Sequence, residues 1–288
     1  MTAASNTAQA GANHAWLHSY PKGVDWHQTF APAPLYSLMD AAVAKHAGKP
    51  CTNFLGKVLT YKEIARMTDR AAAGLQKLGV KKGTKVGLFM PNCPTFIIYY
   101  FATLKAGGTV VNYNPLYTLD ELTFQVKDSE TEIMVTLDLK ILFDKVEALL
   151  HAGILPRAIV ASFPALLPSP KSVLFKLFKG KELARPAASN AKDRIVPEAD
   201  LMANDGAFQR VAIDPLNDIA VLQYTGGTTG TPKGAMLTHA NVFINVKQVA
   251  AWAPELIQGG EKVLGALPFF HVFAMTVVMN FGISRGGE

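Results

Sequence analysis

A short stretch rich in glycine and threonine is the part of this sequence best suited to chemistry. Residues 223–239 read QYTGGTTGTPKGAMLTH, and residues 225–234 contain four glycines, four threonines, one proline and one lysine. Glycines let backbone N–H groups converge on an anion, and threonine hydroxyls add further donors. A mobile lysine ammonium can reach a terminal phosphate. The stretch therefore predicts a phosphate-binding loop, whose candidate residues are Thr225, Gly226, Gly227, Thr228, Thr229, Gly230, Thr231 and Lys233.

The segments on either side of the loop support this interpretation. An apolar strand, DIAVLQY, precedes it, and we expect the helix THANVFINVKQVAAW to follow, with Thr238 as its N-cap. A strand, a glycine-rich loop and a helix together bind phosphate well, because the helix N-terminus adds a favourable dipole. A flexible turn without a ligand is the alternative, and four threonines with a lysine in this context disfavour it.

Two other nucleotide-binding patterns fit this loop less well. A Walker A loop requires G-x-x-x-x-G-K-[ST]. Here Gly234 follows Lys233, so no hydroxyl stands where the magnesium ligand should be. The glycine spacing is not G-x-G-x-x-G either, which argues against a dinucleotide. A P-loop ATPase or kinase is therefore disfavoured.

Upstream of the loop, apolar strands alternate with helices across short connections. Thr60 with Glu63, and Thr118 with Glu121, each have the spacing of a helix capping box. The alternation predicts an α/β fold with mostly parallel sheets covered by helices, and with ligands near the carboxyl ends of the strands. We expect strands at KVGLFMPN, TVVNYNP, EIMVTL and RAIVAS.

The predicted domain organisation has two α/β lobes. Six prolines fall between residues 156 and 205, where the alternation breaks. We expect a first lobe over residues 1–155, an irregular proline-rich connection over 156–205, and the start of an incomplete second lobe over 206–288.

Net charge and cysteine content indicate the cellular compartment and the kinds of partner. The net charge is +6, and the lysines and arginines are scattered rather than clustered. Nucleic-acid binding would need a basic patch with a readable motif, so we expect none. A modest excess suits an anionic small molecule or an anionic membrane surface. Cys51 and Cys93 form no metal-binding or redox motif, and two thiols fit a reducing cytoplasm.

Two segments bear on membrane contact. Residues 263–283 carry no charge and are long enough to span a bilayer. Pro268, His271 and Asn280 lie within them, so a buried strand, a loop and a core helix are the better interpretation. Residues 171–181, KSVLFKLFKGK, could form a basic amphipathic helix that lies on a membrane. An ordinary surface helix is the favoured alternative there.

The sequence also resembles a known family. YTGGTTGTPKGAMLTH is similar to the signature of the acyl-adenylate-forming superfamily, and its spelling is most similar to bacterial long-chain fatty acid–CoA ligases. The segments LTYKEI, LKAGGTVVNYNPLYT and ALPFFHVFAMT resemble further family segments in the expected order. The resemblance implies two half-reactions. A carboxylate attacks the α-phosphate of ATP to give acyl-AMP, and coenzyme A thiolate then displaces AMP.

The resemblance also implies roles for individual residues. The loop would hold the β- and γ-phosphates of ATP, with Mg²⁺ sharing the charge. His271 corresponds to a family position that lines the acyl site, and Phe270 beside it suits an apolar tail. A core histidine with a backbone partner is the alternative for His271. Tyr224 is either a core aromatic or a wall of the acyl site.

The family's later segments are not found in this sequence. Neither an aromatic-Gly-x-Thr-Glu segment nor Thr-Gly-Asp occurs in it. In the family, these segments contact adenine, magnesium and ribose, and the catalytic lysine lies in a small C-terminal domain beyond them. We therefore expect this chain to be roughly the first half of a ligase, and inactive alone. The alternative is an α/β module that binds nucleotide or phosphate without turnover.

Overall fold

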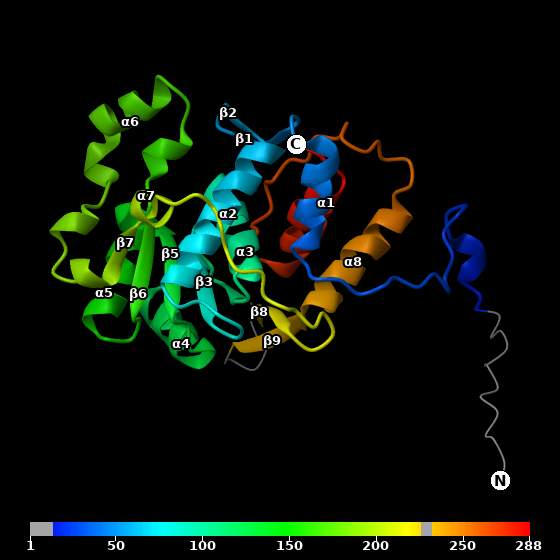
Figure 1. Cartoon of the computed structure of the whole chain (residues 1–288), viewed down its shortest axis with the longest axis horizontal. Helices are drawn as coiled ribbons and strands as arrows, with labels where there is room; N and C mark the ends of the chain where they lie inside the picture. The colour runs from blue at the N-terminus through cyan, green and yellow to red at the C-terminus, as the bar shows by residue number, and fades with distance from the viewer. Residues whose placement is uncertain (1–13, 226–231) are drawn as a thin grey trace, which may run out of the picture.

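The computed structural model describes residues 14–225 and 232–288, and most of its strands lie in one sheet (Figure 1). The strand order in that sheet is β7-β6-β5-β3-β4-β8-β9. A separate antiparallel hairpin joins β1 (Pro50–Phe54) to β2 (Lys57–Thr60). The strands of the large sheet are β3 (Lys85–Phe89), β4 (Thr109–Asn112), β5 (Ile133–Leu137), β6 (Arg157–Ala161), β7 (Ile195–Pro197), β8 (Ile219–Thr225) and β9 (Lys233–Thr238).

The sheet is parallel from β7 to β8 and antiparallel only between β8 and β9. Every residue of β4 and β5 is buried, as expected of parallel strands covered on both faces. Each strand predicted upstream of the proline-rich segment is present. The α/β fold class is thereby confirmed.

Helices pack around the sheet, and the capping signals place several of their starts correctly. Thr60 Oγ1 accepts a hydrogen bond from Glu63 N, and the Glu63 carboxylate accepts one from Thr60 N at 2.8 Å. Thr118 and Glu121 form the same reciprocal pair. The helices are α1 (Ser37–His46), α2 (Tyr61–Lys77), α3 (Pro94–Lys105), α4 (Leu119–Ser129), α5 (Lys140–His151), α6 (Lys171–Lys179), α7 (Glu198–Leu201), α8 (His239–Trp252), the π-helical η6 (Ala274–Asn280) and α9 (Phe281–Ser284).

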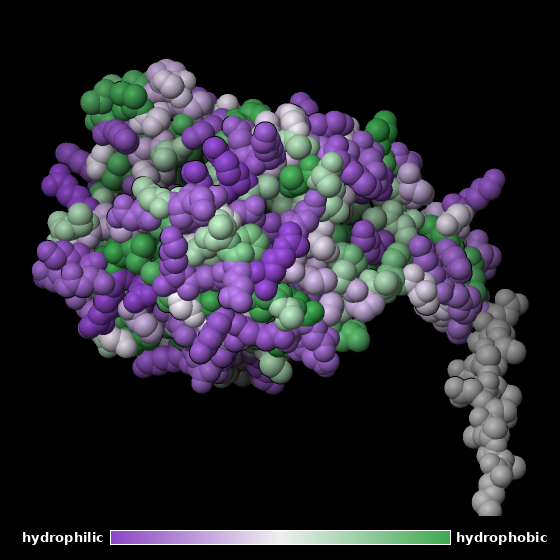
Figure 2. All heavy atoms as spheres, viewed as in Figure 1, coloured by the Kyte–Doolittle hydropathy of each residue, from purple (hydrophilic) through white to green (hydrophobic). Residues whose placement is uncertain are grey.

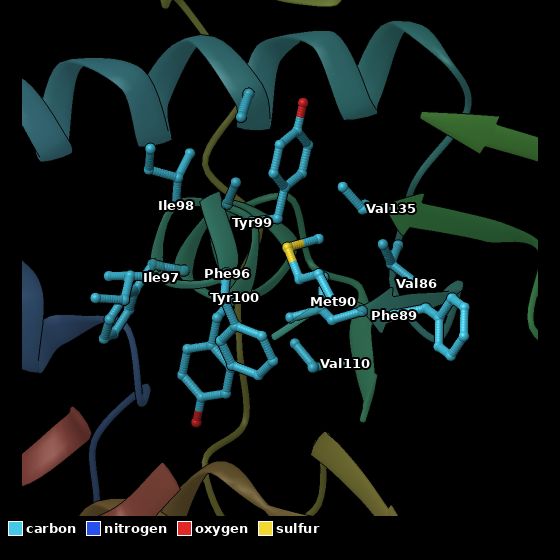
Figure 3. Close-up of a cluster of buried hydrophobic side chains, with 14 of the residues drawn as sticks. Val86, Phe89, Met90, Phe96, Ile97, Ile98, Tyr99, Tyr100, Val110 and Val135 are labelled. Atoms are coloured by element: carbon cyan, nitrogen blue, oxygen red, sulfur yellow. The ribbon is translucent and has the colours of Figure 1, made fainter. Parts of the chain in front are cut away.

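Helix α3 forms the centre of the hydrophobic core. All twelve of its residues are buried, and Figure 3 shows Phe96 and Tyr99 among side chains of the neighbouring strands. Its last residue, Lys105, forms ion pairs of 2.8 Å with Asp40 of α1 and Asp69 of α2. Burial alone would lower the Lys105 pKa, but its hydrogen bonds and charge interactions with the two aspartates raise it overall. The ammonium therefore stays charged inside the fold.

The structure changes the expected connectivity after residue 155. The proline-rich segment is not wholly irregular, because it contains the predicted strand β6 and the helix α6, and in addition β7 and α7. Strand β8, which we expected to begin a second lobe, pairs in parallel with β4 through Val110–Val221 and Val111–Leu222. The apolar residues of β8 are accommodated beside β4, so the first sheet extends to Thr238. Beyond this placement, the lobe division at 206–288 stays a prediction.

The secondary structure predicted for the uncharged segment 263–283 is correct only in part. Residues 263–270 form no strand, which corrects the expected buried strand, whereas η6 and α9 confirm the core helix. Across residues 14–225 and 232–288, each helix is too short or too polar to cross a bilayer.

Glu198, the first residue of α7, places a carboxyl group inside the fold. Its Oε1 atom is enclosed and has no hydrogen-bond partner among the described residues. Burial, with a smaller contribution from the Asp138 charge, raises the pKa of Glu198 to about 7. A carboxyl group with a raised folded-state pKa stabilises the fold at low pH. That stability is lost as the pH rises from the unfolded value of 4.5 through about 7.

We predict that Glu198→Gln removes this pH dependence, because the amide is neutral at every pH. Above pH 7 the free energy of unfolding should exceed that of the parent by at most roughly 3 kcal/mol. At pH 4.5 the two should be nearly equal. Urea denaturation across this pH range measures the difference, with Glu132→Gln as an exposed control. Parallel curves for Glu198→Gln and the parent would contradict the prediction.

Candidate active site

The candidate phosphate loop connects two antiparallel strands. Strand β8 ends at Thr225 and β9 begins at Lys233, and these two residues are paired across the hairpin. Both are exposed. The pairing brings the first and last predicted loop residues to opposite sides of one opening. The remaining predicted residues, Gly226, Gly227, Thr228, Thr229, Gly230 and Thr231, lie outside the described part of the chain.

The expected order of strand, loop and helix is wrong, because β9 stands between the loop and α8. Residues 235–237 are extended and pair with β8, for example Met236 with Leu222. Helix α8 begins only at His239, with Thr238 as its N-cap as predicted, where Oγ1 accepts from Asn241 N at 3.2 Å. The N-terminal dipole of α8 therefore does not lie at the loop.

Tyr224 faces away from the predicted acyl-site residues. Its hydroxyl donates to the carboxylate of Asp128 on α4, and its ring packs so close to Gly234 that a Cβ there would lie 3.1 Å from it. Burial, followed by the hydrogen bond to Asp128, raises the pKa of Tyr224. The structure does not bring Tyr224 together with Phe270 or His271.

Gln223, rather than Tyr224, is the β8 residue directed toward the predicted acyl segment. Successive side chains of a strand point to opposite faces, so Gln223 lies on the other face of β8 and is buried. Its Nε2 donates to the carbonyl of Phe270 at 2.9 Å. Its Oε1 accepts from Asn112 Nδ2 of β4 at 3.1 Å. A buried amide thus connects the strand before the loop to the predicted acyl segment.

Asn92 holds the same segment from a second direction. It follows β3 and donates from Nδ2 to the carbonyls of Gly265 at 2.8 Å and Leu267 at 2.7 Å. Its Oδ1 accepts from the Phe269 backbone N–H at 2.7 Å. One side chain therefore hydrogen-bonds three backbone groups of this segment. Its position agrees with the rule that ligand sites lie beyond the carboxyl ends of parallel strands.

His271 is exposed, and this excludes the alternative of a core histidine. Its backbone N–H donates to the carbonyl of Pro268 at 3.0 Å, and its Nδ1 accepts from Phe273 N at 3.3 Å. These contacts form the turn that leads into η6. Phe270 is half-buried beside it. The structure therefore brings Phe270 and His271 together on one turn, which Gln223 holds by its contact with the Phe270 carbonyl.

An apolar cavity of about 360 Å³ lies behind this segment. Phe269 forms part of its wall, with its ring 5.8 Å from that of Phe96 on α3. Cys93, beside Asn92, also lines it and is buried without a disulfide partner. A cavity of this chemistry suits an apolar chain. Further lining residues are Ile97, Val278, Met279 and Ile283.

Sequence reasoning missed Gln223 and Asn92. The available signal was a polar residue at the carboxyl end of a predicted strand, directly before the loop or before a proline-initiated helix. Within the described ranges, no three histidine, cysteine or acidic side chains converge as a metal site would require.

The chain belongs to the AMP-binding enzyme family, whose family model matches residues 39–288. Among curated proteins, it is 38% identical over 273 residues to a long-chain-fatty-acid–CoA ligase of Bacillus subtilis, covering 95% of this chain and 48% of that protein. It is 34% identical over 282 residues to the corresponding ligase of Escherichia coli O157:H7, covering 95% and 49%. The chain spans about half the length of the curated relatives it matches.

Solved structures agree with the family assignment. A long-chain-fatty-acid–CoA ligase from Archaeoglobus fulgidus superposes with a TM-score of 0.70 at 25% identity, covering 93% of this chain and 48% of that one. ATP-bound MatB from Rhodopseudomonas palustris gives a TM-score of 0.68 at 23% identity, covering 89% and 44%. The second likeness, at this identity, shows the shared fold.

We predict that Asn92→Ala loosens the segment around Phe269. The change leaves two carbonyls and one N–H without their partner, at a cost of about 1–3 kcal/mol. The Phe269 amide should exchange with deuterium faster, as measured by mass spectrometry or NMR. Asn53→Ala is the control, because its side chain accepts one hydrogen bond, from Gly56 N, in a surface turn. Unchanged protection of Phe269 in Asn92→Ala would refute the role of Asn92.

Proposed function

We propose that this chain is part of an AMP-forming long-chain fatty acid–CoA ligase. The main support is the similarity over 95% of the chain to curated ligases of that activity, together with the signature loop. The reaction would join a long-chain fatty acid to coenzyme A through an acyl-AMP intermediate. A binding module without turnover is not favoured, because the similarity extends along the chain and not only over the loop.

The proposed ATP site is the opening of the β8–β9 hairpin. Thr225 and Lys233 are paired across this opening and exposed to solvent, so a hydroxyl and an ammonium are both available to phosphate oxygens. With the loop threonines and glycines, they would hold the β- and γ-phosphates that leave as pyrophosphate. Charge stabilisation and positioning provide most of the catalysis in such reactions. Bound Mg²⁺ would neutralise part of the phosphate charge.

The proposed acyl site is the turn that carries Phe270 and His271, with the apolar cavity behind it. Gln223 hydrogen-bonds to this turn and directly precedes Tyr224 and the loop, so the acyl carboxylate and the ATP phosphates would meet beside the end of β8. Tyr224 has its hydroxyl on Asp128 and is therefore better suited to holding the hairpin than to lining the acyl site. Coenzyme A would enter in the second half-reaction and displace AMP. The proposed location is the cytoplasm, with peripheral contact at the inner face of the membrane.

We predict that Lys233→Ala weakens the use of ATP in the complete enzyme. Loss of a charged hydrogen bond costs about 1.5–3 kcal/mol, so kcat/KM for ATP should fall by a factor of roughly ten to a hundred. Steady-state kinetics with saturating fatty acid measures this. Lys127→Ala, an exposed lysine on α4, is the matched control and should behave as the parent. An unaltered KM and kcat for ATP in Lys233→Ala would remove this lysine from the site.

We predict that the 288 residues alone do not catalyse formation of acyl-AMP. They contain the loop and the acyl turn but none of the family's adenine, ribose or C-terminal lysine motifs. Losing one positioned electrostatic donor costs about 10²–10³ in rate, and here several would be missing. ATP–pyrophosphate exchange with palmitate should therefore be undetectable beside a full-length relative. Exchange at a comparable rate would place the whole catalytic machinery within these residues.

A further inference from the structure

Helix α6 directs its apolar side chains into solvent. None of its nine residues is buried. Leu177 and Phe178 are 72% and 78% exposed, and Val173 is 56% exposed. Figure 2 shows the resulting apolar group at the position of α6, at the upper left of the molecule. An amphipathic helix on a protein surface normally buries its apolar stripe, so this helix has the opposite orientation.

The attachment of α6 explains this orientation. At 100° per residue, Val173, Leu174, Leu177 and Phe178 fall within one arc of the helix. Phe175 falls outside that arc and packs against Phe163 with ring centroids 5.0 Å apart. The helix is therefore held to the body by another side, and its apolar arc remains available.

The β1–β2 turn continues the apolar surface beside α6. Leu55, at the tip of this turn, is 54% exposed. Lys171 Nζ donates to the Leu55 carbonyl at 2.8 Å and so ties the turn to the start of α6. A shallow groove between them is lined mainly by apolar side chains. We call Leu55 and the apolar arc of α6 the docking surface.

Charge around the docking surface has one dominant sign. Residues 171–182 contain four lysines and one acidic residue, Glu182, for a net charge of +3. Lys176 and Lys179 are exposed on α6, and Lys179 is paired with Glu182 at 2.7 Å. Lysine stems extend along apolar surface while their ammonium groups remain in water. An apolar arc beside lysines is the chemistry of a helix that lies in the headgroup region of an anionic bilayer.

We propose that the docking surface binds the protein to anionic phospholipid bilayers. The helix is about 13 Å long, too short to span a membrane, so it would lie in the plane of the interface. Its apolar arc and Leu55 would enter the acyl boundary, and the lysines would contact lipid phosphates. This names the surface for the peripheral contact proposed above. Binding itself requires no ligase activity, so the two proposals can fail separately.

Vesicle co-sedimentation of the 288-residue chain tests the docking surface. The vesicles contain phosphatidylglycerol and phosphatidylcholine in equal parts, with pure phosphatidylcholine vesicles as the uncharged comparison. The apolar test variant is Leu177→Gln with Phe178→Gln, and its control is Ile141→Gln, an apolar residue 69% exposed on α5. The charge variant is Lys176→Gln with Lys179→Gln, and its control is Lys127→Gln on α4.

We expect the parent chain and both controls to sediment with the anionic vesicles. The apolar variant should lower the partition coefficient at least tenfold. The charge variant should lower it on anionic vesicles only, and added salt should have the same effect on the parent. Equal sedimentation of the apolar variant and the parent would overturn the proposal. The proposal would also be overturned if the parent chain does not bind vesicles but forms a dimer, measured by light scattering, through Leu177 and Phe178. The docking surface would then bind a second copy of the chain.

Discussion

The complete burial of α3 is the constraint on which the candidate site depends. A helix with no exposed residue cannot shift without moving the sheet and the helices around it, because protein interiors are close-packed. Its start therefore fixes the turn that carries Asn92, and Asn92 fixes the backbone from Gly265 to Phe269. Its end is held by Lys105 between Asp40 and Asp69. Packing of the core thus determines where the proposed acyl turn lies.

Two amide side chains, half-buried Asn92 and buried Gln223, connect the core to the candidate site. Asn92 links the end of β3 to the acyl segment, and Gln223 links β8 to the next part of the same segment. Buried polar groups are costly unless their hydrogen bonds are satisfied, so they favour one arrangement over others. The turn that carries Phe270 and the start of the candidate phosphate loop are accordingly held in fixed relation without a ligand. Preorganisation of this kind would favour the proposed attack of a carboxylate on the α-phosphate of ATP.

Features that depend on local sequence signals were predicted correctly. Features that depend on contacts between distant parts of the chain were not. The capping boxes at Thr60 and Thr118 depend on residues three positions apart, so helix starts were readable. Strand β9 was missed because its short apolar run precedes a helix directly and its partner is fixed only by pairing with β8. The role of Asn92 depends on contacts with residues more than 170 positions away. The amphipathic pattern of α6 was visible, but which side faces solvent follows from where Phe163 lies.

Gly234 affects the register of the β8–β9 hairpin and thereby the position of Lys233. In a paired strand, a slip of one residue moves every side chain to the opposite face. Such a slip would bring Lys233 or Ala235 against the Tyr224 ring, where even a Cβ at Gly234 would approach to 3.1 Å. The ring would have to move by a few tenths of an ångström to admit a side chain there, so the pairing of Tyr224 with Gly234 favours the observed register. The absence of a side chain at position 234 thus favours one register of β9, and with it the side of the hairpin on which Lys233 lies.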